Sequence, residues 1–490
     1  MVLVSTFPRA LLQISKKFKP IPSQRYFSTA MSAFLCDHLK QIHSTALKSV
    51  NGDTLIKEII SFNKGSMIIT RESEIKQFDL NGKDVYLIGS GKGVLGLCLG
   101  FLKALERQNA SRNDRITITK GIISMPVGIK CHHFDLLERH NITAFFGAKN
   151  NLPDEDSVVA TNAILDLIDS VIKGETSSRP KVFISLITGG ASALLVAPRE
   201  PLTLTKKREL TQTLMAAGCT INELNSVRSC WSKVKAGQLA LRVLSESNNV
   251  EMVNLIASDV IGDPMDIIGS GPTVLPPDDS LNPLEIIDMY KISIDEDIRN
   301  LCQLVKPSSN IDDRLHNLII VNNRIALNSI TNLMTQLDYK IIDLGNQISG
   351  EASTLGSRFA QIARTSEKGE GKICWIGGGE TVVTLTTTHG KGGRCQEMAL
   401  QFLIDTFHDQ LTNFAFLAGG TDGQDGPTPI SGIIYQYSDR ITSEIYDAAK
   451  VHLSNHDAYT FWSENLPECM IDTGGPTGVN VMDIYCLLQC

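Results

Sequence analysis

The sequence contains no long apolar run. A helix that spans a bilayer needs about 20 consecutive apolar residues, and no stretch of the 490 residues approaches that length. An excess of basic residues is also missing, because 46 Lys and Arg stand against 53 Asp and Glu, a net charge of −7. Such a chain has no overall positive field to attract nucleic acid. We therefore expect no membrane span and no nucleic-acid partner.

Paired cysteine spacing is absent as well. The 11 cysteines lack the spacing of a zinc site or a disulfide framework, which is typical of a protein from a reducing compartment. Cys131, His132 and His133 are adjacent, but no second ligand pair follows at a usable spacing, so we do not interpret them as a metal site. A hydrophobic content of 42% is ordinary for a globular protein, and the length suffices for two or three domains.

Acidic residues are missing from the N-terminal segment, where none precedes Asp37 and several basic residues do. This composition is typical of a mitochondrial transit peptide, and Arg25 to Ser28 resembles a matrix-processing site. We predict that residues 1–31 are a transit peptide and that the mature chain begins near Ser28 or Met31 in the mitochondrial matrix. Met31 as a second start would give a cytosolic form. The alternative is a disordered basic tail.

Short apolar runs end repeatedly in glycine-rich loops, which begin at Gly89, Gly189, Ser258, Gly377 and Gly419. Helical patterns alternate with these runs, and this alternation predicts α/β layers with largely parallel sheets. Ligands of such sheets bind beyond the carboxyl ends of the strands. We therefore expect the loops to line one binding site. We also expect a strand over 382–388, which is rich in Thr and Val.

The first of these loops carries Lys92 between an expected strand and an expected helix. It is not a P-loop, because Gly93 replaces the Ser or Thr that binds Mg²⁺. Residues 91–96 match G-x-G-x-x-G, but Asp114 precedes the next expected strand instead of ending it, as the dinucleotide fingerprint requires. A lysine at a helix N-terminus remains, which suits an anionic substrate or a transferring phosphate. The alternative is an exposed surface lysine.

Two further stretches carry polar residues that point to binding. Asp422 and Asp425 lie three apart on a loop with four glycines, which suits a hard cation or a polyol, although a tight solvated turn has the same composition. Residues 222–235 are compatible with a helix that would bring four polar residues near each other, namely Asn225, Arg228, Lys233 and Lys235. The alternative there is a charged, exposed helix.

Seven longer motifs follow one another along the chain: TGGASALL (188–195), SDVIGDP (258–264), GSGPT (269–273), GGGET (377–381), GKGGRCQE (390–397), GGTDGQDGPT (419–428) and TGVNVMD (477–483). In these motifs the chain resembles the type II glycerate kinase family, whose C-terminal domain is known as MOFRL. The resemblance covers about residues 32–488.

This resemblance implies two α/β domains with the active site in the cleft between them. Residues 32–280 would form a Rossmann-like three-layer domain, and residues 281–490 a second domain with the MOFRL region at about 372–488. The implied reaction is ATP-dependent, Mg²⁺-assisted phosphorylation of D-glycerate, with 2-phosphoglycerate favoured over 3-phosphoglycerate. The implied protein is a monomer or homodimer.

By the same resemblance, the catalytic residues are Lys92 and Arg394. From the residues themselves, either Asp422 and Asp425 or Asp259 and Asp263 could hold Mg²⁺ or accept the hydroxyl proton, and we predict that Asp422 and Asp425 ligate Mg²⁺. The substrate- or ATP-binding positions are Gly89, Gly91, Gly189, Gly190, Ser192, Asn225, Lys235, Asp259, Gly378, Gly379, Glu380 and Asn480. The chain departs from the family pattern at Thr188, Ala236, Cys395 and residues 151–152. None of these departures removes a charged group from the implied site.

Two alternatives belong to other functional classes. The G-x-G-x-x-G match would suit an NAD(P)H-dependent hydroxypyruvate reductase, and a metabolite-binding relative that has lost catalysis would keep the same fold. ATP consumption that depends on D-glycerate discriminates between the three.

Overall fold

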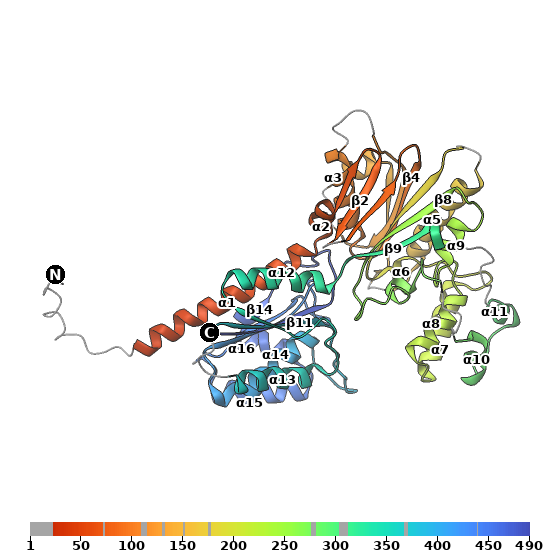
Figure 1. Cartoon of the computed structure of the whole chain (residues 1–490). Coiled ribbons are helices and arrows are strands. Elements are labelled where there is room, and N and C mark those ends of the chain that lie inside the picture. The colour runs from red at the N-terminus through yellow and green to blue at the C-terminus, as the bar shows by residue number, and fades with distance from the viewer. Residues whose placement is uncertain are drawn as a thin grey trace, which may run out of the picture.

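The computed structural model describes residues 23–490 except 72–73, 109–114, 130–132, 150–151, 175–177, 276–280, 303–311, 367–370 and 439. Most of the predicted transit peptide, the Cys131 and His132 pair, Asp114 and Asn151 therefore lie outside the described residues. Figure 1 shows two lobes side by side, each built on its own sheet. No helix in the described part of the chain is long and apolar enough to cross a membrane.

The first lobe is built on a six-stranded sheet in the order β6-β5-β4-β7-β8-β9. All its neighbouring strands pair in parallel. In chain order this is 3-2-1-4-5-6, the doubly wound order of Rossmann-like domains. The prediction of a parallel, Rossmann-like sheet is confirmed here. The strands are β4 (Asp84–Ser90), β5 (Ile118–Pro126), β6 (Ile142–Gly147), β7 (Lys181–Ile187), β8 (Val250–Ala257) and β9 (Leu315–Val321).

Helices cover both faces of this first sheet, because its strands are apolar on both sides. Along β4, Val85 and Leu87 enter the core beneath α2 and α3, whereas Tyr86 and Ile88 enter the core beneath α5 and α9. A small antiparallel sheet also packs on the first of these faces. The elements are α2 (Gly52–Ile59), β1 (Ile60–Asn63), β2 (Ser66–Arg71), β3 (Glu74–Asp79), α3 (Val94–Gln108), α4 (Phe134–Arg139), α5 (Glu155–Lys173), α6 (Ala191–Leu194) and α9 (Gln238–Leu244).

A helical arm projects from the first lobe (Figure 1). It has its own small core, which includes Leu214, Trp231 and Ile287. Its helices are α7 (Leu204–Ala216), α8 (Ile221–Cys230), α10 (Pro283–Met289) and α11 (Glu296–Asn300). The helix expected over 222–235 ends early, because the chain leaves the helical conformation at Trp231.

The second lobe is built on a mixed six-stranded sheet in the order β10-β11-β15-β12-β13-β14. Only β10 and β11 pair in parallel, and the other pairs are antiparallel. The prediction of a largely parallel sheet is therefore wrong for this half, because the C-terminal strand β15 inserts between β11 and β12. The strands are β10 (Lys340–Asp343), β11 (Ile373–Gly379), β12 (Phe414–Gly420), β13 (Gly432–Gln436), β14 (Met470–Ile471) and β15 (Asp483–Gln489).

This second sheet is also covered on both faces. One face carries α1 (Ser23–Ser49) and α12 (Asn323–Gln336). The other carries α13 (Ala352–Thr365), α14 (Arg394–Thr406), α15 (Ser443–Ser454) and α16 (Ala458–Asn465). The strand expected over 382–388 is wrong: the segment is irregular, with only an isolated bridge between Glu351 and Val382, because its residues have no neighbouring strand to pair with.

The two lobes do not divide the chain at residue 280, where we predicted the boundary. Strand β9 pairs with β8 and completes the first sheet, so the first lobe continues to Val321. Helix α1 lies on the second lobe (Figure 1), where His38 Nδ1 contacts the Tyr339 hydroxyl at 3.0 Å and Cys36 Sγ donates to Gln436 Oε1 at 3.3 Å. The chain therefore starts on the second lobe, builds the first and returns.

Candidate functional site

In the first lobe, the switch in strand order falls between β4 and β7, where the loops at their carboxyl ends meet. The Lys92 N–H donates to the Gly189 carbonyl at 2.8 Å, and the Gly93 N–H donates to Thr188 Oγ1 at 3.0 Å. Gly91 has φ 132°, and a Cβ there would overlap the Thr188 side chain. Only glycine fits this position. The two loops thereby hold Lys92 at the carboxyl ends of strands β4 and β7.

Asp259 joins Lys92 from the loop after β8. Gly189 makes this approach possible, since a Cβ at Gly189 would overlap the Asp259 carboxylate. Burial, with smaller contributions from the nearby charges of Glu380 and Asp422, raises the pKa of Asp259 to about 6, and Lys92 opposes this increase. Asn480, from the second lobe, donates through Nδ2 to Asp259 Oδ2 at 3.2 Å. The two lobes therefore meet at this loop.

The second lobe contributes the ends of three adjacent strands. Strands β11 and β12 are both antiparallel to β15, so their carboxyl ends lie at the edge where β15 begins. Gly379 and Gly420 both stand opposite Asp483, the first residue of β15. The next residues beyond these strand ends include Glu380 and Asp422. Topology therefore places three carboxylates at one edge, although they are far apart in sequence.

Arg394 connects these carboxylates. It begins α14, and its Nε and Nη2 donate to the two carboxylate oxygens of Asp483 at 2.6 and 2.8 Å. Its Nη1 lies 2.9 Å from Glu380 Oε1. Burial opposes the charge of Arg394, but the hydrogen bonds and charge of Asp483 raise its pKa. Asp483 is fully buried, so this bidentate pair fixes the guanidinium rigidly.

Together these residues form a charged cluster of Lys92, Asp259, Glu380, Arg394, Asp422 and Asp483. Burial raises the pKa of Asp422, and the negative charge of Asp483 adds to this increase. The positive charges of Lys92 and Arg394 oppose it. Burial also raises the pKa of Glu380. Four carboxylates against two cations leave two negative charges, a balance that suits a divalent cation arriving with an anionic ligand.

Asp425 has a different environment from the one we predicted. Its carboxylate accepts the N–H groups of Cys395 at 3.1 Å and Gln396 at 2.9 Å, and the Gln396 side-chain amide as well. It is buried and caps the N-terminus of α14. The hypothesis that Asp425 is a metal ligand does not fit this geometry, because both of its oxygens face helix donors. We interpret it as a positioning residue for Arg394.

This environment gives a testable pH dependence. Burial raises the pKa of Asp425 to about 6, and Asp483 contributes. Because folding raises this pKa, the group stabilises the fold most at low pH and loses that contribution as the pH rises through about 6. We expect the free energy of unfolding of the wild type, relative to Asp425→Asn, to rise by about 1 kcal/mol between about pH 7.5 and 5.5.

Urea unfolding at both pH values measures this difference. Asp447→Asn is the matched control, because Asp447 is exposed and pairs with Lys450 on the surface of α15. The difference in free energy of unfolding between the wild type and Asp447→Asn should be the same at both pH values. If the difference between the wild type and Asp425→Asn is also the same at both, folding does not raise the pKa of Asp425.

Several other predicted site residues lie around the cluster. Gly89, Gly91, Gly189 and Gly190 form the first-lobe loops, and Gly378 and Gly379 end β11. Ser192, Lys235 and Asn225 lie farther back: Lys235 Nζ donates to the Ser192 carbonyl at 2.9 Å, and Asn225 lies on α8 in the helical arm. No hydrogen bond or ion pair in the described part of the chain joins these three to Lys92 or Arg394.

Asp483 and Thr188 are the contacts that sequence reasoning missed. Asp483 stands at the end of TGVNVMD, a motif used only for the resemblance, and its position between two glycine-ended strands appears only in the sheet. Thr188 was noted as the first residue of TGGASALL and as a departure from the family pattern, with no role assigned to it, yet its hydroxyl accepts the Gly93 N–H.

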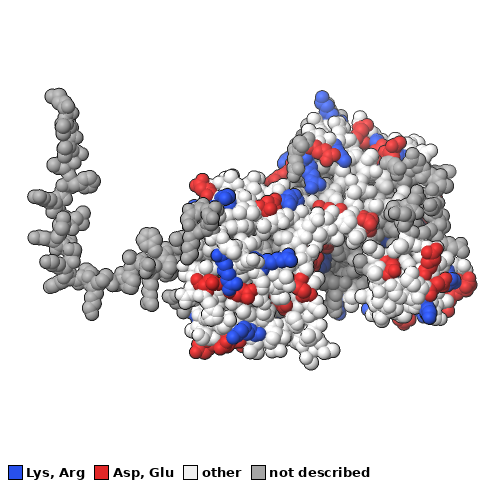
Figure 2. All heavy atoms as spheres, turned by 60° about the horizontal axis from the view of Figure 1, so that its bottom comes forward, with Lys and Arg blue, Asp and Glu red and all other residues white. Residues whose placement is uncertain are grey.

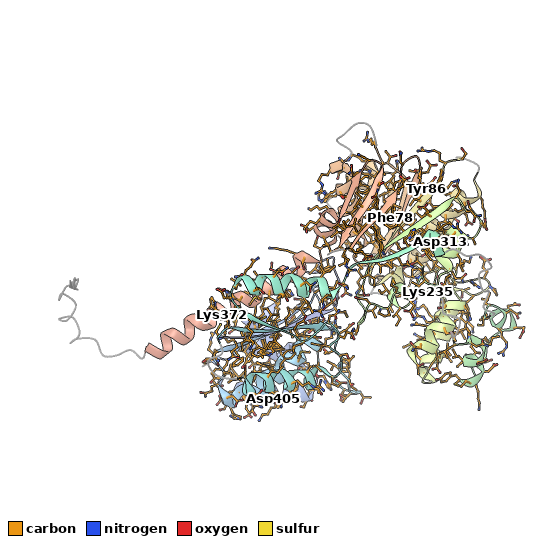
Figure 3. The ribbon with its side chains drawn as sticks, in the orientation of Figure 1. Phe78, Tyr86, Lys235, Asp313, Lys372 and Asp405 are labelled. Atoms are coloured by element: carbon orange, nitrogen blue, oxygen red, sulfur yellow. The ribbon has the colours of Figure 1, made fainter. Side chains whose placement is uncertain are left out.

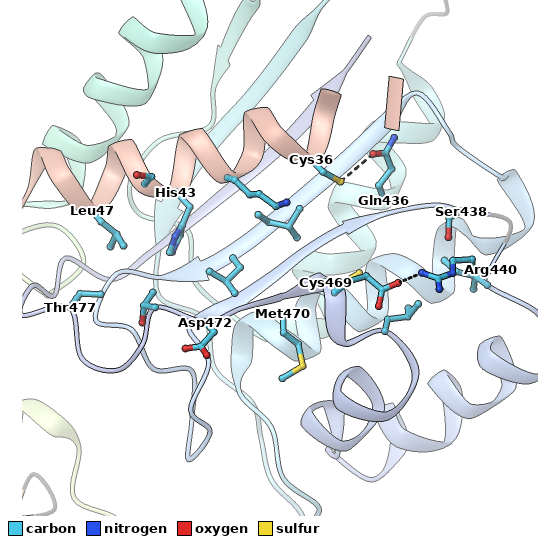
Figure 4. A pocket seen from close by; sticks show the side chains of 18 of the residues that line it. Cys36, His43, Leu47, Gln436, Ser438, Arg440, Cys469, Met470, Asp472 and Thr477 are labelled. Carbon is cyan, nitrogen blue, oxygen red and sulfur yellow. Dashed lines mark hydrogen bonds and ion pairs between the residues drawn. The ribbon is translucent and has the colours of Figure 1, made fainter. Parts of the chain in front are cut away.

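A separate cavity of about 760 Å³ lies between α1 and the second sheet (Figure 4). Cys36, His43 and Leu47 line it from α1, and Met470 and Thr477 line it from the opposite side. Neither Lys92 nor Arg394 is among its lining residues. The paired charges and glycine loops therefore distinguish the charged cluster, and not this cavity, as the candidate active site.

The surface agrees with the sequence charge balance. Figure 2 shows acidic and basic side chains interspersed over one face of the molecule. Neither sign covers that face continuously, so it presents no broad positive surface of the kind that binds nucleic acid.

The chain folds as a two-lobed α/β protein with a charged cluster where its lobes meet. Two family profiles match the chain: the domain of unknown function DUF4147 over residues 38–303 and the MOFRL family over residues 373–483. The glycerate kinase of Danio rerio is 31% identical over 513 residues, which cover 92% of this chain and 96% of the relative. The chain belongs to the glycerate kinase family.

Other relatives agree with this assignment. The glycerate 2-kinase of Pyrococcus horikoshii is 30% identical over 429 residues, covering 84% of this chain and 88% of the relative. A crystal structure described as glycerate kinase of Thermotoga maritima superimposes with a TM-score of 0.75 at 25% identity, covering 94% of this chain and 100% of that one. The resemblance and the two-domain α/β fold predicted from the sequence are thus confirmed.

Proposed function

We propose that this chain transfers the γ-phosphoryl group of ATP to D-glycerate, preferring the 2-hydroxyl over the 3-hydroxyl, and releases ADP. Membership of the glycerate kinase family supports the reaction class, and the relative named glycerate 2-kinase supports the 2-position. The observation that carries the proposal is the charged cluster. In it, Asp483 and Glu380 fix Arg394, and the positive charges of Arg394 and Lys92 both act on the carboxylate of Asp422.

The cluster suits phosphoryl transfer because that reaction needs charge neutralisation and alignment more than covalent chemistry. Lys92, at a helix N-terminus, would bind the transferring phosphate as a point charge. Arg394 presents a planar fork that matches the glycerate carboxylate. Asp259, with a pKa of about 6, is ionised at neutral pH and would accept the proton of the attacking hydroxyl as its oxygen bonds to phosphorus and ADP leaves.

We also propose that Mg²⁺ accompanies the nucleotide and that Asp422 helps to hold it. In the described part of the chain, no three His, Cys, Asp or Glu side chains converge to form a complete metal site. Mg²⁺ in kinases usually needs only one or two protein carboxylates, with phosphate oxygens and water completing the shell. The two excess negative charges of the cluster fit this arrangement. The ion would neutralise phosphate charge.

A coupled assay of ATP consumption tests the reaction. We expect turnover only when D-glycerate, ATP and Mg²⁺ are all present, and loss of turnover when EDTA removes the metal. NADH oxidation by hydroxypyruvate without ATP would instead support the reductase alternative, which no relative favours. Binding of glycerate without either reaction would indicate a protein that has lost catalysis.

The position of transfer is a separate prediction. Phosphorus NMR of the product should show the phosphate on the carbon that carries the 2-hydroxyl, as a doublet coupled to one proton. A triplet from two methylene protons would identify 3-phosphoglycerate and overturn the regiochemistry while leaving the kinase reaction intact.

We further propose that the protein is located in the mitochondrial matrix, on the basis of its acid-poor N-terminus. N-terminal sequencing of protein purified from mitochondria should find a first residue near Ser28 or Met31. An intact Met1 would contradict processing.

A further inference from the structure

Three basic side chains gather behind the first-lobe loops, at the root of the helical arm. They are Lys207 of α7, Arg228 of α8 and Lys235 in the turn that follows α8, and we call them the cation cluster. Lys207 is 6% exposed and Lys235 is 2% exposed, whereas Arg228 is partly accessible. Figure 3 shows Lys235 between the first sheet and the arm. Burial of this kind is rare for lysine unless an anion is its partner.

The partners of this cluster are all uncharged. Lys207 Nζ donates to the Trp231 carbonyl at 3.2 Å, and Arg228 Nη1 donates to Asn225 Oδ1 at 3.3 Å. Lys235 Nζ donates to the Ser192 carbonyl and to Ser270 Oγ at 3.2 Å. Within the described residues, none of the three forms an ion pair with a carboxylate. An ammonium has three N–H donors and a guanidinium five, so donors remain unused.

Burial and mutual repulsion make the charged forms of these side chains unfavourable in free energy when no anion is bound. Burial, with smaller contributions from Arg228 and Arg199, lowers the pKa of Lys207 to about 7, and Cys230 opposes this decrease. Burial also lowers the pKa of Lys235 well below its usual value, with Arg228 and Lys207 contributing. The apolar side chains of the arm core contribute no charge to offset this. A bound anion would restore the charged form of both lysines.

The position of the cluster connects it to the active site. Lys235 holds Ser192, which lies in α6 directly after Gly190, and a Cβ at Gly190 would contact Lys92 at 2.8 Å. Ser270 belongs to the segment after β8 that also carries Asp259. The cation cluster therefore lies behind the same loops that hold Lys92 and Asp259. Asn225 and Arg228, both partly exposed and one helical turn apart, give it a side that faces solvent.

We propose that the cation cluster is an anion subsite that binds a phosphate or carboxylate group. The identity of that anion, as part of the nucleotide or of the acceptor acid, rests on the proposed function. The subsite itself rests on the three cations and their neutral partners. It would bind either a phosphate of the nucleotide that is not transferred or, in place of Arg394, the glycerate carboxylate, while Lys92 acts on the transferring phosphate. Arg228 would provide a fork for two anion oxygens.

Sulfate is the first probe, because its charge is constant between about pH 6.5 and 8.5. We expect Arg228→Gln and Lys207→Met each to weaken sulfate binding at least about tenfold, as expected for the loss of a charge-assisted hydrogen bond. Arg228→Lys should retain part of the affinity. Lys206→Gln is the matched control, because Lys206 is the exposed neighbour of Lys207 and its ammonium pairs with Glu209. Circular dichroism verifies that each variant is folded.

Proton uptake provides a readout that a purely structural role would not change. At about pH 8, Lys207 is largely neutral in the free protein, so sulfate binding to the wild type should take up protons from the buffer. Titration calorimetry in two buffers of different ionisation enthalpy measures this uptake. Lys207→Met should reduce it, and Lys206→Gln should not.

ADP and D-glycerate, titrated separately, distinguish the two sources of the anion. Arg228→Gln should weaken whichever ligand places its anion in the subsite and leave the other unchanged. Equal sulfate, ADP and glycerate affinities in folded wild type and Arg228→Gln would overturn the subsite, even if the kinase assay succeeds. Failure of the kinase assay with variant-sensitive sulfate binding would overturn the proposed function and leave the subsite standing.

Discussion

Arg394→Ala should lower kcat by at least about a hundredfold, as expected when a partner of transition-state charge is lost. Asp483 and Glu380 hold the guanidinium of Arg394 at 2.6–2.9 Å, at the edge of the second sheet. Its loss removes the fork that would orient the carboxylate and compensate phosphate charge. Steady-state kinetics with ATP and D-glycerate measure the effect.

Folding has to be separated from catalysis in this experiment. Removing Arg394 leaves the fully buried Asp483 without its cation, which is itself destabilising. The double variant Arg394→Ala with Asp483→Asn removes that buried charge and should be equally inactive but more stable than the single variant. Arg364→Ala is the matched control, since Arg364 pairs with Asp409 on an exposed face of α13. Near-wild-type turnover in a folded Arg394→Ala protein would remove Arg394 from the active site.

Lys92→Ala is expected to have an effect of similar size, at least about a hundredfold in kcat, for a different reason. The backbone of this residue is held by the Gly189 carbonyl, so alanine keeps the loop and loses only the ammonium. The variant should therefore fold normally and still bind ADP, while the charge that stabilises the transferring phosphate is missing. Kinetics and ADP titration together separate binding from turnover.

Lys120→Ala provides the control for this second prediction, because Lys120 is an exposed lysine of β5 in the same lobe. If Lys92→Ala keeps its kcat and only its KM for ATP rises, Lys92 binds the ground state and is not the partner of the transition state. An unchanged kcat and KM would place Lys92 outside the reaction altogether.

The sequence alone determined much of the first lobe. Strand β4, its glycine loop and α3 follow one another in the chain, and local patterns of apolar residues and glycine dictate such units directly. For the same reason Lys92 was found from its neighbours. Arg394, in contrast, was assigned through the family motif, because nothing local distinguishes it from other loop cations.

Only the tertiary structure decided how the distant pieces meet. Asp483 is the first residue of an ordinary apolar strand, and it becomes the partner of Arg394 because β15 inserts between β11 and β12. Asp425 and Asp422 have similar sequence surroundings, yet Asp425 caps α14, whereas Asp422 interacts electrostatically with Lys92 and Arg394. Sequence spacing cannot separate them, because strand insertion and helix docking are long-range contacts.

The lobe boundaries have the same origin. Helix α1 and strand β9 each pack on the lobe opposite to the one that chain order predicts. Burying an apolar face is favourable against any complementary surface, whether that surface is near or distant in sequence. Local residue order thus determined the loops and the kind of chemistry they carry. Long-range packing decided which loops share one site and which carboxylates serve it.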